Sequence, residues 1–390
     1  FLIFTHLDDV GFNSALGSDQ YAGASQKKDT INRIRRLRKI GLNKIPPPFP
    51  NGWYSISESS VLSKENSMSI SCLGENFVAY RTAKNEVYVL DAYCPHMGAN
   101  MGIGGRVIGD NIECPFHRWS FRGIDGECVN VPYSSCVPHG FKVRKWITKE
   151  VNDHIFIWYH ADGDENPWEL PVVTDIDTQK FVFNGRNEFY VNCHIQEIPE
   201  NGADLAHFTA IHNASLLAGG VDPNASPLAN AGTHHWQAMY WSTLTTKMFS
   251  KHLATVALKH SFEILSNFHV FQMDVQGEQI GPSYVQLHMV SPTLGRIEVL
   301  QTITPIEPLV QKVVHRFYAS RALGPLMKFI VIGESIMFER DINMWNHKMF
   351  RHNPQLVKED SAIKNFRNWY LQFYSENSKT FAEAHFNSDW

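Results

Sequence analysis

The sequence lacks a strong excess of charge of either sign. Its formal net charge is −4, so no global basic field would attract nucleic acid, and no nucleic-acid partner is expected. No internal repeat or low-complexity segment is visible, which argues against a repeat architecture. No Gly-x-Gly-x-x-Gly motif follows a strand-like segment, so a nicotinamide cofactor is expected to bind a different chain.

Cysteine is also scarce. The six cysteines among 390 residues lack the density and spacing of a secreted disulfide scaffold. Cys94 and Cys114 belong to a motif described below. The others are predicted to be reduced and buried, which fits a reducing, intracellular compartment; they are Cys72, Cys128, Cys136 and Cys193.

No hydrophobic run within the chain is long enough to span a bilayer, which takes about 20 apolar residues. The most suggestive stretch, residues 323–332, is interrupted by Gly324, Pro325 and Lys328. It is therefore predicted to form a buried helix rather than a transmembrane segment.

A basic run occupies residues 33–39, and the chain begins at Phe1 rather than at methionine. Two interpretations of the run stay open. It is either the solvated face of a helix or the cytosolic flank of a membrane anchor whose apolar part lies upstream of Phe1. The second interpretation would make the protein membrane-associated and facing the cytosol, with the endoplasmic reticulum as a candidate membrane.

Two short motifs are the most informative residues present. Cys94-Pro-His96 precedes Cys114-Pro-Phe-His117, with residues 97–113 between them. Two thiolates and two neutral imidazoles at this spacing are the ligand set of a Rieske [2Fe–2S] cluster, in which histidines replace cysteines on one iron. A structural zinc site is the alternative, although zinc sites commonly use shorter loops.

Length and pattern predict an α+β protein with two domains after an N-terminal segment, 1–50. Short strands and turns over 51–165 predict a small β-rich domain that carries the cluster motifs. For 166–390, β-branched and aromatic residues at 181–195 and 236–305 predict one large antiparallel sheet. Helices are expected over 201–212 and 334–350, which gives a helix-on-sheet catalytic domain.

A second metal site is predicted in the segment 204–212. Asp204 and His207 would share a helix face, since they lie three residues apart. His207 and His212 are five apart, so both reach one metal only if the helix ends or forms a π-bulge between them. Two histidines plus a carboxylate form the ligand set of non-haem Fe(II).

Asp341 is the predicted third ligand, because a carboxylate within an apolar helical stripe is costly unless it is paired or bound to metal. Glu334 and Glu339 are competing candidates. A simpler alternative is that Asp341 pairs with Arg340 or Lys348. The histidines without comparable partners are interpreted as structural; they are His234, His235, His252, His260, His269, His288, His315 and His347.

Taken together, these motifs resemble the Rieske non-haem iron oxygenases from about Trp53 to Tyr374. The resemblance includes the Cys/His pattern, segment 204–212, Asp341-x-x-x-Trp345 and segment 366–374. Within that superfamily, the sequences around the two cluster motifs (91–100 and 113–121) are similar to the Neverland group of animal cholesterol 7-desaturases. Bacterial 3-ketosteroid hydroxylases are more distant relatives.

The resemblance implies a role for each matching residue. Cys94, His96, Cys114 and His117 would hold the cluster, while His207, His212 and Asp341 would hold the catalytic iron. Asp204 would be a bridging carboxylate that contacts His207 in its own subunit and His117 of a neighbour. In the family each cluster serves the iron of the next subunit in a homotrimer.

The implied activity is oxygen-dependent conversion of cholesterol to 7-dehydrocholesterol in ecdysteroid-type steroid hormone biosynthesis. Electrons would pass from NAD(P)H through a separate reductase to the cluster and then to the iron, with O2 as cosubstrate. Two alternatives remain: a Rieske monooxygenase that hydroxylates a sterol or another hydrophobic substrate, and a pure electron carrier. The iron-ligand candidates argue against the carrier.

Overall fold

The computed structural model describes residues 7–8, 44–137, 139–220, 223–244, 250–264 and 268–386. The basic run 33–39 lies outside this part of the chain. Contacts between residues divide the chain into two compact units. The small β unit is Asn51–Val172, and the large-sheet unit combines Phe1–Pro50 with Val173–Trp390. The described residues before Asn51 therefore group with the second unit.

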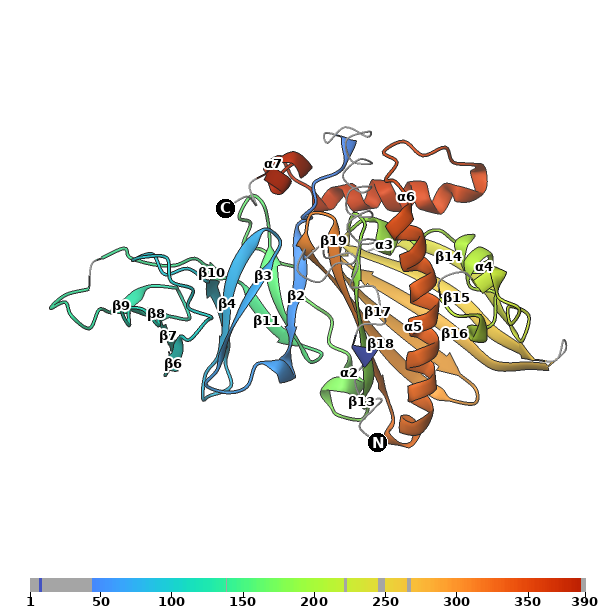
Figure 1. Ribbon diagram of the computed structural model, residues 1–390, viewed down its shortest axis with the longest axis horizontal. Helices are drawn as coiled ribbons and strands as arrows, with labels where there is room; N and C mark the ends of the chain where they lie inside the picture. Colours follow the sequence, from blue (N-terminus) through green and yellow to red (C-terminus); the bar gives the residue numbers. More distant parts are fainter. Residues whose placement is uncertain are drawn as a thin grey trace. The chain divides into compact units, whose positions relative to one another are not determined.

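The small β unit contains short antiparallel strands in three sheets (Figure 1). The sheet orders are β10-β5-β4-β3, β11-β12-β2 and β6-β7-β8-β9. A hairpin turn at Lys84-Asn85 joins β4 to β5, and Asn85 takes a positive φ of 74° that asparagine tolerates in turns. The strands are β2 (Gly52–Glu58), β3 (Ser67–Cys72), β4 (Glu75–Arg81), β5 (Val87–Asp91), β6 (Arg106–Ile108), β7 (Asn111–Glu113), β8 (Ser120–Arg122), β9 (Cys128–Asn130), β10 (Lys145–Trp146), β11 (Thr148–Val151) and β12 (His154–Tyr159), with a 3-10 turn, η3 (Ser59–Val61).

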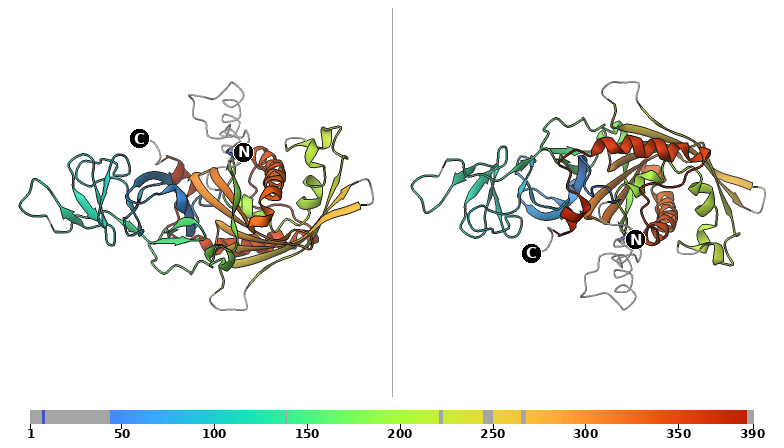
Figure 2. Two further views of the ribbon diagram at one scale, coloured as in Figure 1. Left: turned by 90° about the horizontal axis from the view of Figure 1, so that it is seen from below. Right: turned by 90° about the horizontal axis from the view of Figure 1, so that it is seen from above.

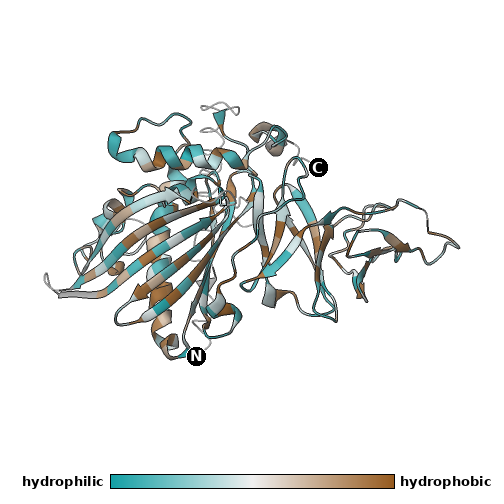
Figure 3. Cartoon of the chain, turned by 180° about the vertical axis from the view of Figure 1, so that it is seen from behind, coloured by the Kyte–Doolittle hydropathy of each residue, from teal (hydrophilic) through white to brown (hydrophobic). Residues whose placement is uncertain are grey.

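The large-sheet unit is built on one eight-stranded sheet in the order β1-β13-β19-β18-β17-β16-β15-β14. All neighbours pair antiparallel except β1, which is parallel to β13. Hydrophilic and hydrophobic residues alternate along the strands (Figure 3), as expected where the two faces of a sheet meet different surroundings. The strands are β1 (Leu7–Asp8), β13 (Val182–Val191), β14 (Thr233–Thr243), β15 (Leu253–Ile264), β16 (Phe268–Ile280), β17 (Tyr284–Ser291), β18 (Gly295–Glu307) and β19 (Val310–Ala319).

Helices of this unit cover one face of the sheet, with α5 lying across it and α4 beside α5 (Figure 2). Buried Met327 and Val331 of α5 pack against Val299 and Phe317 of β18 and β19. No helix in the described part of the chain is both long and apolar enough to cross a membrane. The helices are α2 (Thr174–Asp177), α3 (Glu197–Glu200), α4 (His207–Ile211), α5 (Gly324–His347), α6 (Ser361–Tyr370) and α7 (Phe381–Phe386), with 3-10 turns η4 (Leu216–Ala218), η5 (Pro223–Ala225), η6 (Arg321–Leu323), η7 (Lys358–Asp360) and η8 (Leu371–Phe373).

The predicted α+β class and the large antiparallel sheet are confirmed, but three boundaries differ. The sheet continues to Ala319, beyond the expected end at 305. Helix α5 begins at Gly324, so the buried helix predicted over 323–332 is confirmed but is continuous with the helix predicted over 334–350; Pro325 lies in its first turn, where no donor is lost. The helix expected over 201–212 is limited to α4, because the Asp204 carboxylate accepts the His207 main-chain N–H and favours a turn before it.

Candidate metal centres

The two Cys/His motifs lie in loops that adjoin the strands of the small β unit. The first motif follows β5, and the second connects β7 to β8. Each cysteine opens a tight turn: Gly98 donates its N–H to the Cys94 carbonyl at 2.9 Å, and Arg118 donates to the Cys114 carbonyl at 3.0 Å. Both cysteines are buried, and burial raises the pKa of the Cys94 thiol to about 11. A bound cation would offset this penalty on the thiolate.

The two motif histidines lie side by side, with ring centroids 4.6 Å apart at 73°. The His96 ring stacks on Trp119 at 4.5 Å. Trp119 in turn donates its indole N–H to the Tyr133 hydroxyl at 2.8 Å. Trp119, itself fixed by Tyr133, therefore orients the His96 imidazole, as residues around metal ligands commonly do.

The donor set fits a two-iron cluster better than a single zinc ion. Ligands of one tetrahedral zinc converge on a single point. Among the described residues, only His207, His212 and Asp341 form a group whose ligand atoms all lie within 4.8 Å of one another. The ligand atoms of motif residues 94, 96, 114 and 117 do not converge in this way. Two buried thiols beside two partly exposed imidazoles match the mixed ligation of a Rieske cluster.

The remaining cysteines are free. Cys72, Cys128 and Cys193 are buried as predicted, but the prediction was wrong for Cys136, which is exposed. Cys136 lies in an irregular loop between β9 and β10, where its side chain has no core to enter.

Cys114→Ser is expected to remove the cluster, because a neutral hydroxyl replaces one of its two thiolate ligands. The reduced wild-type protein should show the low mean g value of a Rieske centre in its EPR spectrum, and the variant should show none. Cys136→Ser is the matched control and should keep the signal. Zinc without iron in anaerobically purified wild-type protein would contradict the cluster assignment.

The second centre brings together His207, His212 and Asp341 in the large-sheet unit. The Asp341 Oδ1 atom lies 3.3 Å from His212 Nε2 and 4.0 Å from His207 Nε2. The two imidazole centroids are 5.4 Å apart at 78°. The three side chains are buried or nearly so, and together they supply the two-histidine, one-carboxylate set that leaves positions open on iron.

The five-residue spacing of the histidines is accommodated because α4 ends between them. The helix spans His207–Ile211, and His212 follows as its C-cap with φ −104° and ψ 4°. This departure from helical geometry turns the His212 ring toward His207, so no π-bulge is needed.

The tautomer of His207 follows from its contact with the preceding turn. Its Nδ1 atom contacts the main-chain carbonyl of Asp204. A carbonyl only accepts, so Nδ1 carries the hydrogen and Nε2 keeps a free lone pair that faces Asp341. Burial lowers the pKa of His207, which favours the neutral form that a metal requires.

Asp204 itself differs from the expected arrangement. Its carboxylate Oδ1 accepts the main-chain N–H of His207 at 3.2 Å, while the His207 ring is held by the Asp204 carbonyl. Within one chain the residue therefore supports His207 through the backbone rather than through a carboxylate–imidazole bond. Asp204 Oδ2, which does not make this bond, is thus available for a further partner.

The contacts of Asp341 fit a metal ligand better than those of Glu334 and Glu339 do. Asn201 donates its amide to Asp341 Oδ1 at 3.0 Å and orients the carboxylate. Glu334 instead accepts from Asn187 and lies 3.3 Å from His315. Burial raises the pKa of Glu334 to about 8 and that of Glu339 to about 6, so both carboxyl groups ionise less readily than an ordinary glutamate.

Neither suggested cationic partner binds Asp341. Lys348 pairs with Glu197 at 3.2 Å. Arg340 is directed at the loop after α4, where it donates to the carbonyls of Ala214 and Ser215 at 2.9 Å each and to that of Gly219 at 3.2 Å. Arg340 thus ties α5, which carries Asp341, to the loop that follows His212.

Arg340→Met is expected to lower both thermal stability and the content of mononuclear iron. The substitution keeps an unbranched side chain but leaves several carbonyls without a donor, at a cost of about 2–4 kcal/mol. Calorimetry and iron analysis would measure the two effects. Arg321→Met, at an exposed arginine just before α5, should change neither; equal iron content in both variants would contradict the role of Arg340.

The second centre opens into a cavity of about 460 Å³ between the sheet and helices α4 and α5. This volume lies in the usual range for small-molecule sites, about 300–1,000 Å³. The wall is mostly apolar and includes Leu258, Val275, Leu287, Met289, Phe317, Phe329 and Ile330. An apolar wall of this kind suits a hydrophobic molecule next to the candidate metal ligands.

The polar residues on this wall that were not predicted as functional include His234, Trp236 and His260. Their strand positions alternate with outward residues, so a period of two along β14 and β15 was the available signal. This alternation does not distinguish residues of a cavity wall from residues of a packed core, because both kinds lie on the inward face of the sheet.

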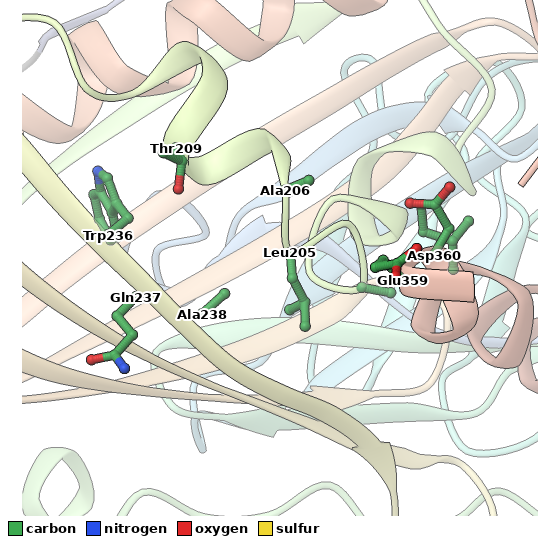
Figure 4. A pocket seen from close by; sticks show the side chains of 10 residues that line it. Leu205, Ala206, Thr209, Trp236, Gln237, Ala238, Glu359 and Asp360 are labelled. Atoms are coloured by element: carbon green, nitrogen blue, oxygen red, sulfur yellow. The ribbon is translucent and has the colours of Figure 1, made fainter. Parts of the chain in front are cut away.

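Trp236 also lines a second hollow, of about 380 Å³. Leu205, Ala206 and Thr209 of the α4 region line it together with Gln237 and Ala238 of β14 (Figure 4). Glu359 and Asp360 of η7 complete the rim. The hollow is thus lined by the immediate neighbours of Asp204.

Two family models match this chain. Residues 52–144 match the Rieske [2Fe-2S] domain, and residues 157–374 match the 3-ketosteroid 9alpha-hydroxylase C-terminal domain. The two matches correspond to the parts of the chain that contain the two candidate centres.

Curated relatives are similar over most of the chain. A cholesterol 7-desaturase of Drosophila melanogaster is 54% identical over 360 residues, 92% of this chain and 83% of the relative. A cholesterol 7-desaturase of Caenorhabditis elegans is 38% identical, over 95% of this chain and 86% of the relative. The oxygenase component of a probable 3-ketosteroid-9-alpha-monooxygenase from Rhodococcus rhodochrous is 27% identical, over 87% and 83%.

Solved structures share the fold. Dicamba monooxygenase bound to dicamba superposes with a TM-score of 0.58 at 16% identity, covering 83% of this chain and 97% of that one. NdmA of Pseudomonas putida CBB5 with caffeine gives a TM-score of 0.59 at 17% identity, covering 87% and 91%. These similarities support the predicted architecture.

Proposed function

This chain belongs to the Rieske oxygenases, in the family of the cholesterol 7-desaturases, and from that premise we propose that it converts cholesterol to 7-dehydrocholesterol. The observation that carries the proposal is that His207, His212 and Asp341, which together could hold a metal ion, line a largely apolar cavity. An almost entirely hydrocarbon substrate needs such a wall. The product would enter ecdysteroid-type steroid hormone synthesis.

The residues of each centre have separate tasks in this proposal. Cys94, His96, Cys114 and His117 would hold a [2Fe–2S] cluster, and His207, His212 and Asp341 would hold Fe(II). When bound, these groups supply single-electron transfer and activation of dioxygen. The chain's own contribution is to hold the ligand nitrogens deprotonated, to orient Asp341 through Asn201 and to exclude water from the cavity.

The balance of the reaction requires external electrons. Removing hydrogen from two neighbouring ring carbons releases two electrons, while reducing O2 to two waters consumes four. NAD(P)H, acting through a separate reductase chain, would supply the other two. A relative named as an oxygenase component supports this division between chains.

The proposed electron transfer also requires assembly of several subunits. We infer a homotrimer in which the cluster of one subunit serves the iron of the next through Asp204. The available Asp204 carboxylate and the hollow lined by its neighbours support such docking. Around the cluster motifs, Met97, Ile103 and Phe116 are apolar and exposed, as expected of a surface that another subunit covers.

Localisation remains a proposal as well. The free cysteines fit a reducing compartment. Association with a membrane facing the cytosol, with the endoplasmic reticulum as candidate, rests on the basic run 33–39 alone.

Hydroxylation is the second candidate function, because the family model for residues 157–374 is that of a 3-ketosteroid hydroxylase. Expression in cholesterol-fed cells, followed by mass spectrometry of the sterols, separates the two. We expect 7-dehydrocholesterol with the wild-type chain and none with His207→Ala. A hydroxylated sterol would favour the monooxygenase, and no new sterol beside an intact Rieske signal would favour an electron carrier.

A further inference from the structure

Two histidines on the wall of the apolar cavity are hydrogen-bonded to each other. His234 of β14 and His260 of β15 lie on neighbouring strands, with His234 Nδ1 2.9 Å from His260 Nε2. Their other ring nitrogens, His234 Nε2 and His260 Nδ1, are buried and have no hydrogen-bond partner among the described residues. Buried polar atoms are nearly always paired in folded proteins, so these two nitrogens indicate a ligand.

The pair presents a defined hydrogen-bonding pattern. Burial lowers the pKa of His234 to about 3 and that of His260 to about 4, so both rings are neutral. One ring must then donate to the other. In either tautomeric arrangement, one outer nitrogen carries a hydrogen and the other a lone pair. A hydroxyl group, which donates and accepts, complements both arrangements.

Trp236 connects this pair to the metal centre. Its ring lies 4.3 Å from His260 and 6.3 Å from His212, centroid to centroid. Its indole Nε1 is also buried without a partner among the described residues. The three polar groups therefore form one patch beside a predicted iron ligand, within a wall that is otherwise mostly apolar.

We propose that His234, His260 and Trp236 bind the 3-hydroxyl group of the sterol. The proposal deepens the sterol desaturase function and rests on it. The hydroxyl is the sole polar group of cholesterol, and the ring that carries it is fused to the ring that contains carbon 7. Whatever holds the hydroxyl must consequently lie near the metal ligands, as this patch does. The patch would fix which ring carbon faces the metal.

Two competing anchors lie on the same wall: Thr255, whose buried Oγ1 also has no partner among the described residues, and Glu334, whose hydrogen bonds are already formed. Glu334 accepts from Asn187 and lies 3.3 Å from His315 Nδ1. The His234–His260 pair offers its outer nitrogens without displacing any protein partner. The experiment therefore includes Glu334 as an explicit alternative.

The test compares cholesterol with cholest-5-ene, which lacks the hydroxyl. Binding of each radiolabelled sterol to the purified holoenzyme would be measured beside turnover. We expect the wild type to bind cholesterol about 10-fold more tightly. The double variant His234→Leu/His260→Leu removes both partners together, so it leaves no ring nitrogen stranded. It should lose this preference by binding cholesterol more weakly while binding cholest-5-ene as before.

Matched variants distinguish a hydroxyl site from a packing role. His235→Leu changes the adjacent residue, whose ring is on the opposite strand face and pairs with Glu263; it should keep the preference. A general packing defect would weaken both sterols equally. If the double variant fails to fold, Trp236→Phe keeps the aromatic ring, deletes one donor and should weaken cholesterol binding alone by several-fold.

An unchanged preference in the double variant would overturn the proposal, as would an unchanged preference in Trp236→Phe where only that variant folds. Loss of the preference in Glu334→Gln but not in the double variant would move the anchor to Glu334. Failure of the desaturase function has a different signature: the wild type would discriminate the hydroxyl in binding yet form no 7-dehydrocholesterol.

Discussion

Asp341→Ala should abolish sterol turnover and remove about one iron in three, the mononuclear one, while the Rieske EPR signal remains. The Asp341 Oδ1 atom faces the Nε2 atoms of His207 and His212, and alanine leaves two imidazoles without an anionic ligand. The cluster ligands are in the other compact unit, so their metal should load normally. Iron analysis and EPR on the same sample measure both parts.

Glu339→Ala is the control for this experiment, since it removes another largely buried carboxylate from the same helix. It should keep its iron even if the protein becomes less stable. Full iron and activity in Asp341→Ala would show that a different carboxylate is the ligand, and Glu334 would be examined next. His207→Ala should reproduce the Asp341→Ala result.

Asp204→Asn is expected to retain both metals and the trimer but to slow turnover about 10–100-fold, the usual effect of losing an outer partner of a metal ligand. The amide has the same shape and can still accept the His207 main-chain N–H through its oxygen. Only the negative charge and one acceptor are lost. The backbone support of His207 should therefore survive, and any loss of activity would report on the carboxylate's additional partner.

The decisive measurement is the oxidation rate of the reduced cluster by O2 in the presence of cholesterol. In Asp204→Asn this rate should fall together with turnover, whereas Asp360→Asn, at the rim of the nearby hollow, should leave it much less affected. A wild-type rate in Asp204→Asn would return Asp204 to a purely structural role in the turn before α4.

Much of the fold was predictable because it depends on local pattern. Strand-like segments separated by turn residues predicted the small β unit, and long β-branched stretches predicted the large antiparallel sheet. The end of the sheet was less predictable, because β19 contains buried polar residues such as Gln311, His315 and Arg316 that interrupt its apolar pattern. The short α4 was overestimated, since the competition of the Asp204 side chain for a main-chain donor depends on a rotamer.

The sequence by itself was enough to predict the candidate cluster ligands and the two histidines of the second centre, since Cys94-x-His96, Cys114-x-x-His117 and the His207–His212 segment are defined by residue type and spacing. Only the tertiary structure decided which carboxylate joins the histidines. Asp341, Glu334 and Glu339 lie on one helix, and the packing of that helix against α4 places Asp341 alone of the three beside both imidazoles. The same holds for His234 and His260. They are 26 positions apart and resemble core histidines until the pairing of β14 with β15 brings their rings together, because a hydrogen-bonded pair is a property of strand register rather than of sequence.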